Sequence, residues 1–189
     1  MNQNIVNYFR NSVFKQMSSM PTSTRLIYFA DELLSQLDYE KSESLTERLQ
    51  NKVFNPRDYV PEFQRNNNKW TLDMKKKFVQ NVLKGVSTNI ILCRIGSDLN
   101  DAFILDGQQR LTALVEFFGN KFSIDVGLDA NMYYRDIEQE IKYIASTISY
   151  YIIKANSLKE ACEFYIDMNE NITHSKADIK IAYDFLDIC

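Results

Sequence analysis

The chain of 189 residues contains a single histidine, His174, and only three cysteines. Nucleases of the His-Asn-His type and triad hydrolases with a paired histidine need more than this one imidazole, so the sequence argues against both classes. The cysteines, Cys93, Cys162 and Cys189, are far apart and form no CxxC pair. This spacing indicates that the cysteines are small, reduced residues of the core, and it argues against a structural zinc site.

Long apolar segments are also missing from the sequence. No stretch of about 18 or more apolar residues could span a membrane, and no N-terminal run resembles a signal peptide. We therefore expect a cytoplasmic protein in a reducing compartment, with no membrane partner. The net charge of -3 says little about other partners, because a local basic patch on an acidic chain can still bind nucleic acid.

The composition is that of a folded protein, with 45% hydrophobic and 13% aromatic residues. A turn signal at Asn55-Pro56-Arg57-Asp58 divides the chain into an N-terminal helical extension, residues 1–55, and a main domain, residues 56–189. In the extension, Thr22-Ser23-Thr24 are start signals for a helix. Its helical stripes predict a packed helical layer or the contact of a homo-oligomer; they are formed by Leu26, Ile27, Ala30, Leu33, Leu34, Leu37, Leu45, Leu49 and Val53.

In the main domain, hydrophobic periodicity predicts helices mixed with strands, an α+β fold. The expected N-caps are Thr71 and Ser157, the second in a capping box with Glu160, and Gly85 and Gly119 are expected helix stops. Strands 89–95 and 102–105 are expected to form a hairpin. The full set is helices at 72–84, 135–146, 158–168 and from 176 onward, a helix after the bend at Gly107 that ends at 118, and strands at 89–95, 102–105, 121–128 and 147–154.

The stretch 102–119, AFILDGQQRLTALVEFFG, carries the most chemistry. A short apolar strand leads into Asp106-Gly107-Gln108-Gln109-Arg110, where Gly107 permits any backbone angle at the bend. A helix follows, with Leu111, Leu114, Val115 and Phe118 predicted on its buried face.

The N–H groups of a first helical turn accept an anion, Arg110 offers bidentate hydrogen bonds, and Asp106 can hold a divalent cation or its water. A polyphosphate ligand requires these three kinds of group: N–H donors, a positive side chain and a carboxylate for its cation. On spacing alone, an equally good interpretation is structural: Asp106 caps the helix and Arg110 pairs with it.

This string, together with Pro61-Glu62-Phe63-Gln64-Arg65 and Trp70 before it, resembles the N-terminal domain of GmrSD-type modification-dependent restriction enzymes. The resemblance covers about residues 56–186 and includes a later segment, Phe164 to Asn169. It implies the ParB N-terminal/sulfiredoxin-like fold, a small mixed sheet flanked by helices, and a site for a nucleoside triphosphate with Mg2+. The implied catalytic residues are Asp106, Gln109 and Arg110, with Asp106 facing the metal, and the implied nucleotide-binding residues are Gln64, Arg65, Gly107, Gln108, Arg110 and Asn169.

Complete enzymes of this type also carry a His-Asn-His nuclease domain, for which this chain offers only His174. We therefore expect a subunit that acts with a separate nuclease, a free-standing enzyme that hydrolyses a nucleotide or transfers its phosphate, or a fragment. The alternative is a DNA-binding or regulatory module with a vestigial or switch-only pocket. Its contact surface would be Lys69, Trp70, Lys75, Lys76 and Lys77, although a solvated helix face also explains these lysines.

Overall fold

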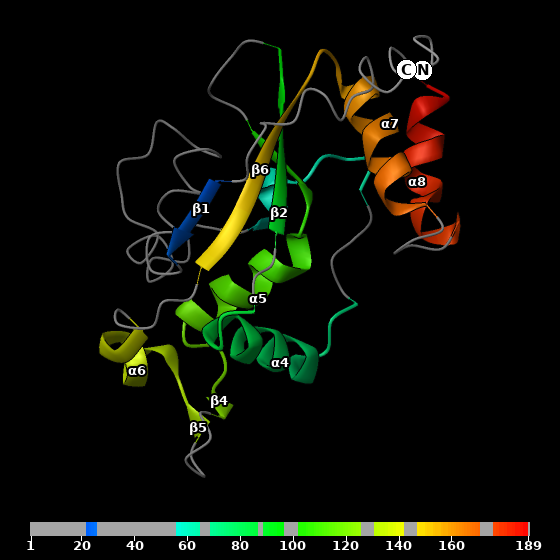
Figure 1. The fold of residues 1–189 in the computed structure, drawn as a ribbon. Helices are drawn as coiled ribbons and strands as arrows, with labels where there is room; N and C mark the ends of the chain where they lie inside the picture. The colour runs from blue at the N-terminus through cyan, green and yellow to red at the C-terminus, as the bar shows by residue number, and fades with distance from the viewer. Residues whose placement is uncertain are drawn as a thin grey trace, which may run out of the picture.

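A computed structural model of the chain describes residues 22–25, 56–64, 69–86, 89–96, 102–125, 131–141, 147–170 and 176–188. Helices and strands alternate along most of these residues (Figure 1). The helical elements are η2 (Pro56–Tyr59, a 3-10 helix), α4 (Leu72–Leu83), α5 (Gln108–Phe118), α6 (Tyr134–Ile141), α7 (Leu158–Asn169) and α8 (Lys176–Leu186). The strands are β1 (Thr22–Arg25), β2 (Asn89–Ile95), β3 (Phe103–Asp106), β4 (Ile124–Asp125), β5 (Asn131–Met132) and β6 (Thr147–Ala155).

The main sheet is four-stranded, in the order β1-β6-β2-β3. β2 runs parallel to β6, whereas β1 and β3 are antiparallel to their neighbours, so the sheet is mixed. The predicted hairpin of β2 and β3 is confirmed, and so is the α+β class with a small mixed sheet flanked by helices. The likeness to the ParB fold in particular stays a prediction.

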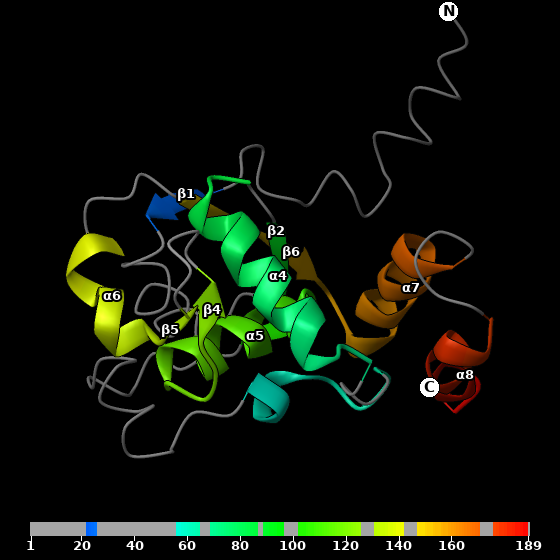
Figure 2. The same cartoon turned by 90° about the horizontal axis from the view of Figure 1, so that it is seen from below.

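Helices cover both faces of this sheet, and Figure 2 shows α4 and α5 as one pair and α7 and α8 as another. Ile90 and Leu92 of β2 belong to a buried cluster shared with α4 and α5, whereas Cys93 belongs to a second cluster shared with α7 and α8. Successive side chains of a strand point to opposite faces. The apolar run of β2 therefore serves both layers, as expected for a strand buried on its two faces.

The helix ends follow the predicted signals, with one difference. Thr71 accepts a hydrogen bond from the Met74 N–H at 3.3 Å and caps α4, and Gly85 follows the helix with a φ of +83°. Gly119 ends α5 as predicted, but its φ is -76° and Asn120 adopts the left-handed conformation, with φ 57°. The conformation that favours glycine therefore falls one residue later than the glycine itself.

The N-terminal region contains one correction. Thr22-Ser23-Thr24 do not start a helix; they belong to β1, which pairs with the edge of β6. Because β-branched threonine fits a strand and an open edge offers backbone partners, tertiary pairing overrides the local capping signal. The remaining predicted helices of residues 1–55 lie outside the described residues, and the boundary at residue 55 stays a prediction.

Two smaller differences concern strands. The strand predicted over 121–128 is described only as Ile124–Asp125, which pairs with the unpredicted strand Asn131–Met132. On α5, Leu111, Leu114 and Val115 are buried as predicted, Phe118 is only partly buried, and Phe117, outside the predicted stripe, is fully buried. Among the described helices, none has the length and apolar character needed to cross a membrane.

Candidate functional site

The candidate site lies where β3 ends and α5 begins. β3 carries Asp106 as its last residue, Gly107 is the N-cap, and α5 starts at Gln108. The start of β2 lies at the same end of the sheet, because Asp106 pairs with Ile91 near the first residues of that strand. We call the group formed by Asp106, Gly107, Gln108, Gln109 and Arg110 the α5 corner.

Gly107 is required at this corner for two independent reasons. Its φ of +94° lies in the left-handed region that favours glycine. A Cβ atom there would also meet the Ile90 Cγ1 atom at 2.9 Å and the Ile90 Cα atom at 3.3 Å. The backbone of the corner therefore approaches β2 more closely than any residue with a side chain permits.

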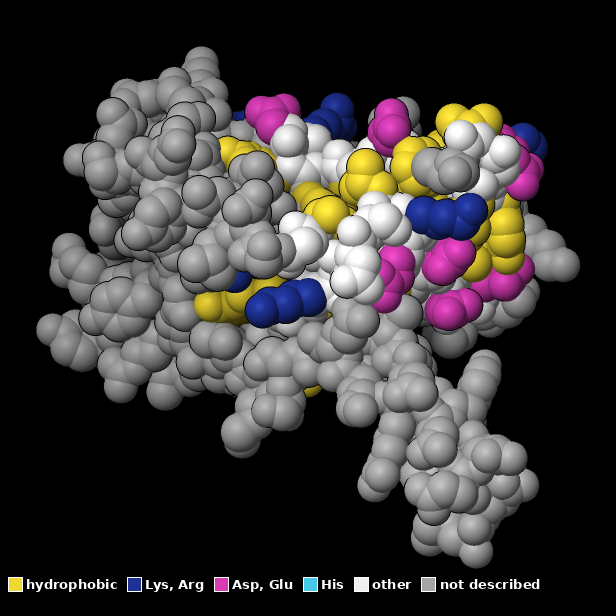
Figure 3. Space-filling model, turned by 90° about the horizontal axis from the view of Figure 1, so that it is seen from above, with side chains coloured by type: hydrophobic (Ala, Val, Ile, Leu, Met, Phe, Trp, Pro, Cys, Tyr) yellow, Lys and Arg dark blue, Asp and Glu magenta, His cyan; other side chains and the backbone are white. Residues whose placement is uncertain are grey.

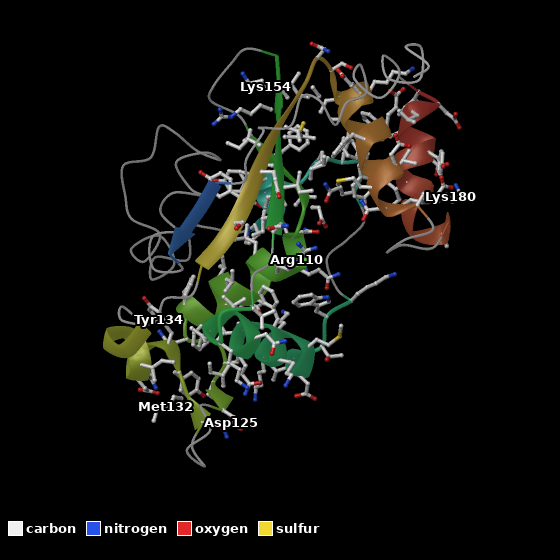
Figure 4. The ribbon with its side chains drawn as sticks, in the orientation of Figure 1. Arg110, Asp125, Met132, Tyr134, Lys154 and Lys180 are labelled. Atoms are coloured by element: carbon white, nitrogen blue, oxygen red, sulfur yellow. The ribbon has the colours of Figure 1, made fainter. Side chains whose placement is uncertain are left out.

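Arg110 joins the corner to the start of β2. Its Nη2 atom lies 3.0 Å from Asp106 Oδ2, an ion pair between positions four residues apart. Its Nη1 atom donates to the carbonyl oxygen of Asn89. Figure 4 shows Arg110 at the junction of the sheet and α5, whereas Lys154 lies at the other end of β6 and Lys180 lies on α8.

The pair of Asp106 and Arg110 stays accessible to a ligand. The two side chains are 31% and 29% exposed, respectively. A guanidinium group has five N–H donors, so the two contacts leave further donors for a phosphate group. The ion pair was one part of the structural interpretation of the sequence, but the other part is wrong, because the N-cap residue is Gly107 and not Asp106.

The two glutamines of the corner differ in their surroundings. The Gln108 carbonyl oxygen accepts a hydrogen bond from Thr112 Oγ1 at 2.8 Å. The Gln109 Oε1 atom is buried, and no hydrogen-bond donor of the described residues reaches it. A buried acceptor without a donor is costly, which makes this oxygen a natural partner for a water or for an N–H group of a ligand.

Gln64 reaches the corner from a distant part of the sequence. Its Nε2 atom donates to the carbonyl oxygens of Ile104 and Leu105, at 2.7 and 2.8 Å. The sequence predicted that Gln64 and Arg65 both face the site. The structure brings Gln64 to the end of β3, and Arg65 lies outside the described residues.

Asn169 occupies a different environment from the corner. It is buried at the end of α7, in the helical layer on the other face of the sheet from α5. Its Nδ2 atom donates to the carbonyl oxygen of Tyr165, one turn earlier in the same helix, at 2.9 Å. The role of Asn169 in nucleotide binding stays a prediction, since this contact by itself accounts for a buried asparagine.

The lysines proposed for nucleic-acid contact do not share one environment. Lys75 forms an ion pair of 2.7 Å with Glu116 of α5, and both side chains are largely buried. Trp70 packs edge-on against Phe78 at 5.2 Å and joins the first core cluster. Lys69 and Lys77 are exposed, and Lys76 is half-buried. One of the five predicted contact residues, Lys75, is thus neutralised by a carboxylate, and another, Trp70, packs against the core.

Charged side chains are mixed on the surface seen in Figure 3, where acidic groups lie beside scattered basic ones. Among the described residues, no group of three or more His, Cys, Asp and Glu side chains could hold a metal ion. Mg2+ in nucleotide sites is often held by one or two carboxylates together with the phosphates. At the corner, Asp106 is the carboxylate that fits this mode.

The family model for the N-terminal domain of GmrSD restriction endonuclease matches residues 42–188. The chain belongs to this family. The family match begins upstream of residue 56, where the resemblance of the sequence was expected to begin. Searches of curated proteins and of solved structures gave no match. Membership of the GmrSD family points to a role in a restriction system.

Sequence reasoning missed two residues of the corner in this GmrSD-family domain. Asn89 supplies a backbone carbonyl to Arg110, and Ile90 sets the space beside Gly107. Both act through the close approach of β2 to the start of α5. No local sequence signal marks a backbone carbonyl as a partner, so only the predicted hairpin could have pointed to this neighbourhood.

Proposed function

We propose that this domain binds a nucleoside triphosphate together with Mg2+ at the α5 corner, and hydrolyses it or transfers its terminal phosphoryl group within a restriction system. The observation that carries the proposal is the start of α5. Its N-cap residue is Gly107, which has no side chain and makes no side-chain cap hydrogen bond. An ion pair with exposed edges lies directly beside it.

The first turn of α5 supplies the electrostatics for an anion. The first four N–H groups of a helix have no partner within the helix, and the helix dipole adds a partial positive charge at this end. A phosphate group can accept several of these N–H groups at once. A glycine N-cap lets the backbone approach such a group without steric hindrance.

Arg110 adds a full positive charge to the partial charges of the helix. Hydrogen bonds between a guanidinium group and phosphate oxygens are among the strongest in proteins. In phosphoryl transfer, charge spreads over the equatorial oxygens of the transferred group, and stabilising that charge is the main catalytic task. Asn89 and Asp106 hold Arg110 in place before any ligand arrives, so little reorganisation is needed.

Asp106 and Gln109 complete the proposed chemistry. When bound, Mg2+ would neutralise phosphate charge, and Asp106 is the side chain that would hold it or a water attached to it. The buried Gln109 Oε1 can accept a hydrogen bond from a water and so orient it for attack. Gln108, Gly107 and Gln64 line or support the same corner, and Arg65 and Asn169 remain proposed nucleotide contacts.

The alternative proposal is a DNA-binding or regulatory module whose nucleotide pocket is vestigial or a switch. It draws its support from the family and from the exposed Lys69 and Lys77. The ion pair of Lys75 with Glu116 lowers the charge available on the same helix. We therefore favour nucleotide chemistry, with DNA and a separate nuclease subunit as proposed partners.

The test measures nucleotide binding and phosphate release for Asp106→Ala and Arg110→Ala. With Mg2+ present, we expect one or more of the four common triphosphates to raise the melting temperature of the native domain. Arg110→Ala should weaken nucleotide binding by about 10- to 100-fold, the loss of charge-assisted hydrogen bonds. Asp106→Ala should reduce the rate of phosphate release on the order of 100-fold or more, with the fold intact.

Matched controls come from α8, where Lys180 and Asp184 form another ion pair between positions four residues apart, at 2.7 Å. Lys180→Ala and Asp184→Ala remove the same type of contact from an exposed helix surface, so they should leave binding and turnover unchanged. Wild-type rates of phosphate release in both corner variants would rule out the proposed site.

A further inference from the structure

β3 departs from regular pairing immediately before Asp106. Leu92 of β2 pairs with Ile104, but its neighbour Ile91 pairs with Asp106. Leu105 is therefore an extra residue on β3, as in a β-bulge. In regular pairing from Leu92 and Ile104, Asp106 would lie opposite Ile90. The bulge moves it by one residue relative to β2.

The side chain of Gln64 lies against this bulge. Its single Nε2 atom donates to the carbonyl oxygens of Ile104 and Leu105, at 2.7 and 2.8 Å. Consecutive carbonyls of a regular strand point to opposite edges, so one amide group meets both of them only where the strand departs from that pattern. Both donors of the Gln64 amide are thus used by the backbone of β3.

Gln64 is itself held by its neighbours. Its backbone N–H donates to the Pro61 carbonyl oxygen at 3.0 Å, which closes a turn. Phe63 beside it is fully buried in the second core cluster, with its ring 5.3 Å from Phe185 and 6.4 Å from Phe103, measured between centroids. The turn and the buried Phe63 therefore hold the backbone from which the Gln64 amide contacts β3.

We propose that Gln64 is a positioning residue, which holds the β3 bulge and so fixes Asp106 relative to Arg110, and that it does not bind the nucleotide directly. This inference rests on the proposed function of the α5 corner. Arg110 reaches Asp106 and the Asn89 carbonyl at the same time, which requires one particular register of β3 against β2.

Strand geometry gives the size of the shift of Asp106 that would follow from losing the bulge. One residue along a strand is a step of about 3.3 Å. A misplacement of about 1 Å in a catalytic group can reduce a rate on the order of 100-fold. Holding the register of Asp106 is thus sufficient to decide whether the corner is active, although Gln64 contacts no reacting atom.

The test compares Gln64→Met with the wild-type domain. Methionine keeps the length and approximate volume of glutamine but has no N–H donor. We expect kcat for phosphate release to fall about 10- to 100-fold while KM changes by less than about threefold, because positioning affects the transition state and not ground-state binding. Without nucleotide, amide hydrogen exchange of residues 104–110 should become faster.

Gln80→Met is the matched control, because Gln80 also donates its Nε2 atom to a backbone carbonyl, that of Asp125, at 2.8 Å. This contact lies between α4 and β4, so its loss should leave kcat and the exchange of 104–110 unchanged. A second variant, Gln64→Glu, replaces the donors by acceptors at the same length. It should give the same pattern as Gln64→Met, and it replaces that variant if methionine prevents folding.

The outcomes separate this inference from the proposed function. Increased KM with unchanged kcat and unchanged exchange would show that Gln64 contacts the nucleotide, and would overturn the positioning role. If the wild-type domain released no phosphate with any triphosphate, the proposed function would fail. The exchange measurement on nucleotide-free Gln64→Met would still be informative. Faster exchange of residues 104–110 would support the role of Gln64 in holding the β3 bulge, and unchanged exchange would refute it.

Discussion

α5 and α7 both follow a strand of the central sheet, but their first turns are built differently. At α7, Ser157 Oγ accepts from the Glu160 N–H at 3.2 Å. The Glu160 carboxylate accepts from the backbone N–H and the side-chain amide of Asn156, at 2.6 and 2.8 Å. At α5, the N-cap residue Gly107 has no side chain and makes no such cap hydrogen bond.

The difference shows how one structural element serves two purposes. The cap of α7 satisfies the Glu160 N–H from within the chain, and the carboxylate of Glu160 complements the helix dipole. The first turn of α5 has no side-chain cap from its N-cap residue and lies beside the ion pair of Asp106 and Arg110. A capped start stabilises the fold, whereas we propose that the start of α5 binds an external anion.

The largest expected effect comes from Gly107→Ala, which adds a side chain at the N-cap residue of α5. The alanine must adopt a φ of +94° and would meet Ile90 Cγ1 and Cα at 2.9 and 3.3 Å. We expect a loss of about 2–5 kcal/mol in the free energy of unfolding, from backbone strain and overpacking together. Nucleotide-dependent stabilisation should disappear as well. Chemical denaturation with and without nucleotide measures both effects.

Gly85→Ala is the control for this prediction, because Gly85 has a similar φ of +83° with nothing within 4 Å of the added Cβ. It should cost only the strain, about 1–3 kcal/mol, and leave nucleotide binding unchanged. Equal losses of stability in the two variants would mean that the contact with Ile90 is relieved without cost, and that the close approach is not essential.

A smaller effect is expected from removing the cap of α7 with Ser157→Ala. The Glu160 N–H loses its partner, which typically costs about 1 kcal/mol of stability. Nucleotide affinity should not change, because this start is not proposed to bind a ligand. Denaturation and a binding titration test the two parts. Weaker nucleotide binding in Ser157→Ala would remove the distinction between the two helix starts.

The smallest effect concerns Cys93, which lies in β2 near the cap of α7. Burial raises the pKa of the Cys93 thiol from 9.0 to about 12, and the negative charge of Glu160 also raises it. Above pH 9 the unfolded chain loses this proton while the folded chain keeps it. Cys93 therefore contributes stability that is complete well below pH 9, begins to fall as the pH approaches 9, and is lost as the pH rises toward 12.

Denaturation at about pH 8 and at about pH 9 should show this loss as about 0.4 kcal/mol in the wild-type domain relative to Cys93→Ala, which lacks the thiol. Identical pH dependence of the two proteins would contradict the raised pKa. Comparing the two proteins is necessary, since other groups also titrate in this range.

Most local structure was predictable, because the relevant signals are local. The strand Asn89–Ile95 has the predicted bounds, and the helix Gln108–Phe118 ends at the predicted residue. Thr71 and Ser157 are the expected caps. In each case the periodicity of apolar residues and the capping residue agree with the final environment. The exception is Thr22–Arg25, where a partner strand distant in sequence decided the structure.

The candidate site was predictable only in part. The string Asp106-Gly107-Gln108-Gln109-Arg110 marked the corner and the family, and Gln64 was predicted to face this region. Its contact was not predictable, because the two carbonyls that it meets become adjacent only through the bulge in β3. The ion pair of Lys75 with Glu116 likewise depends on the packing of α4 against α5.

Local signals in the sequence locate most helices and strands of the main domain, indicate the family that the chain resembles, and place a glycine bend between Asp106 and Arg110. Periodicity, capping and glycine content are properties of neighbouring residues, so they can be read along the chain. The contacts of Asn89, Ile90 and Gln64 around this bend arise only in the folded protein. Their contacts depend on the register of β3 against β2, which is set by the packing of both faces of the sheet.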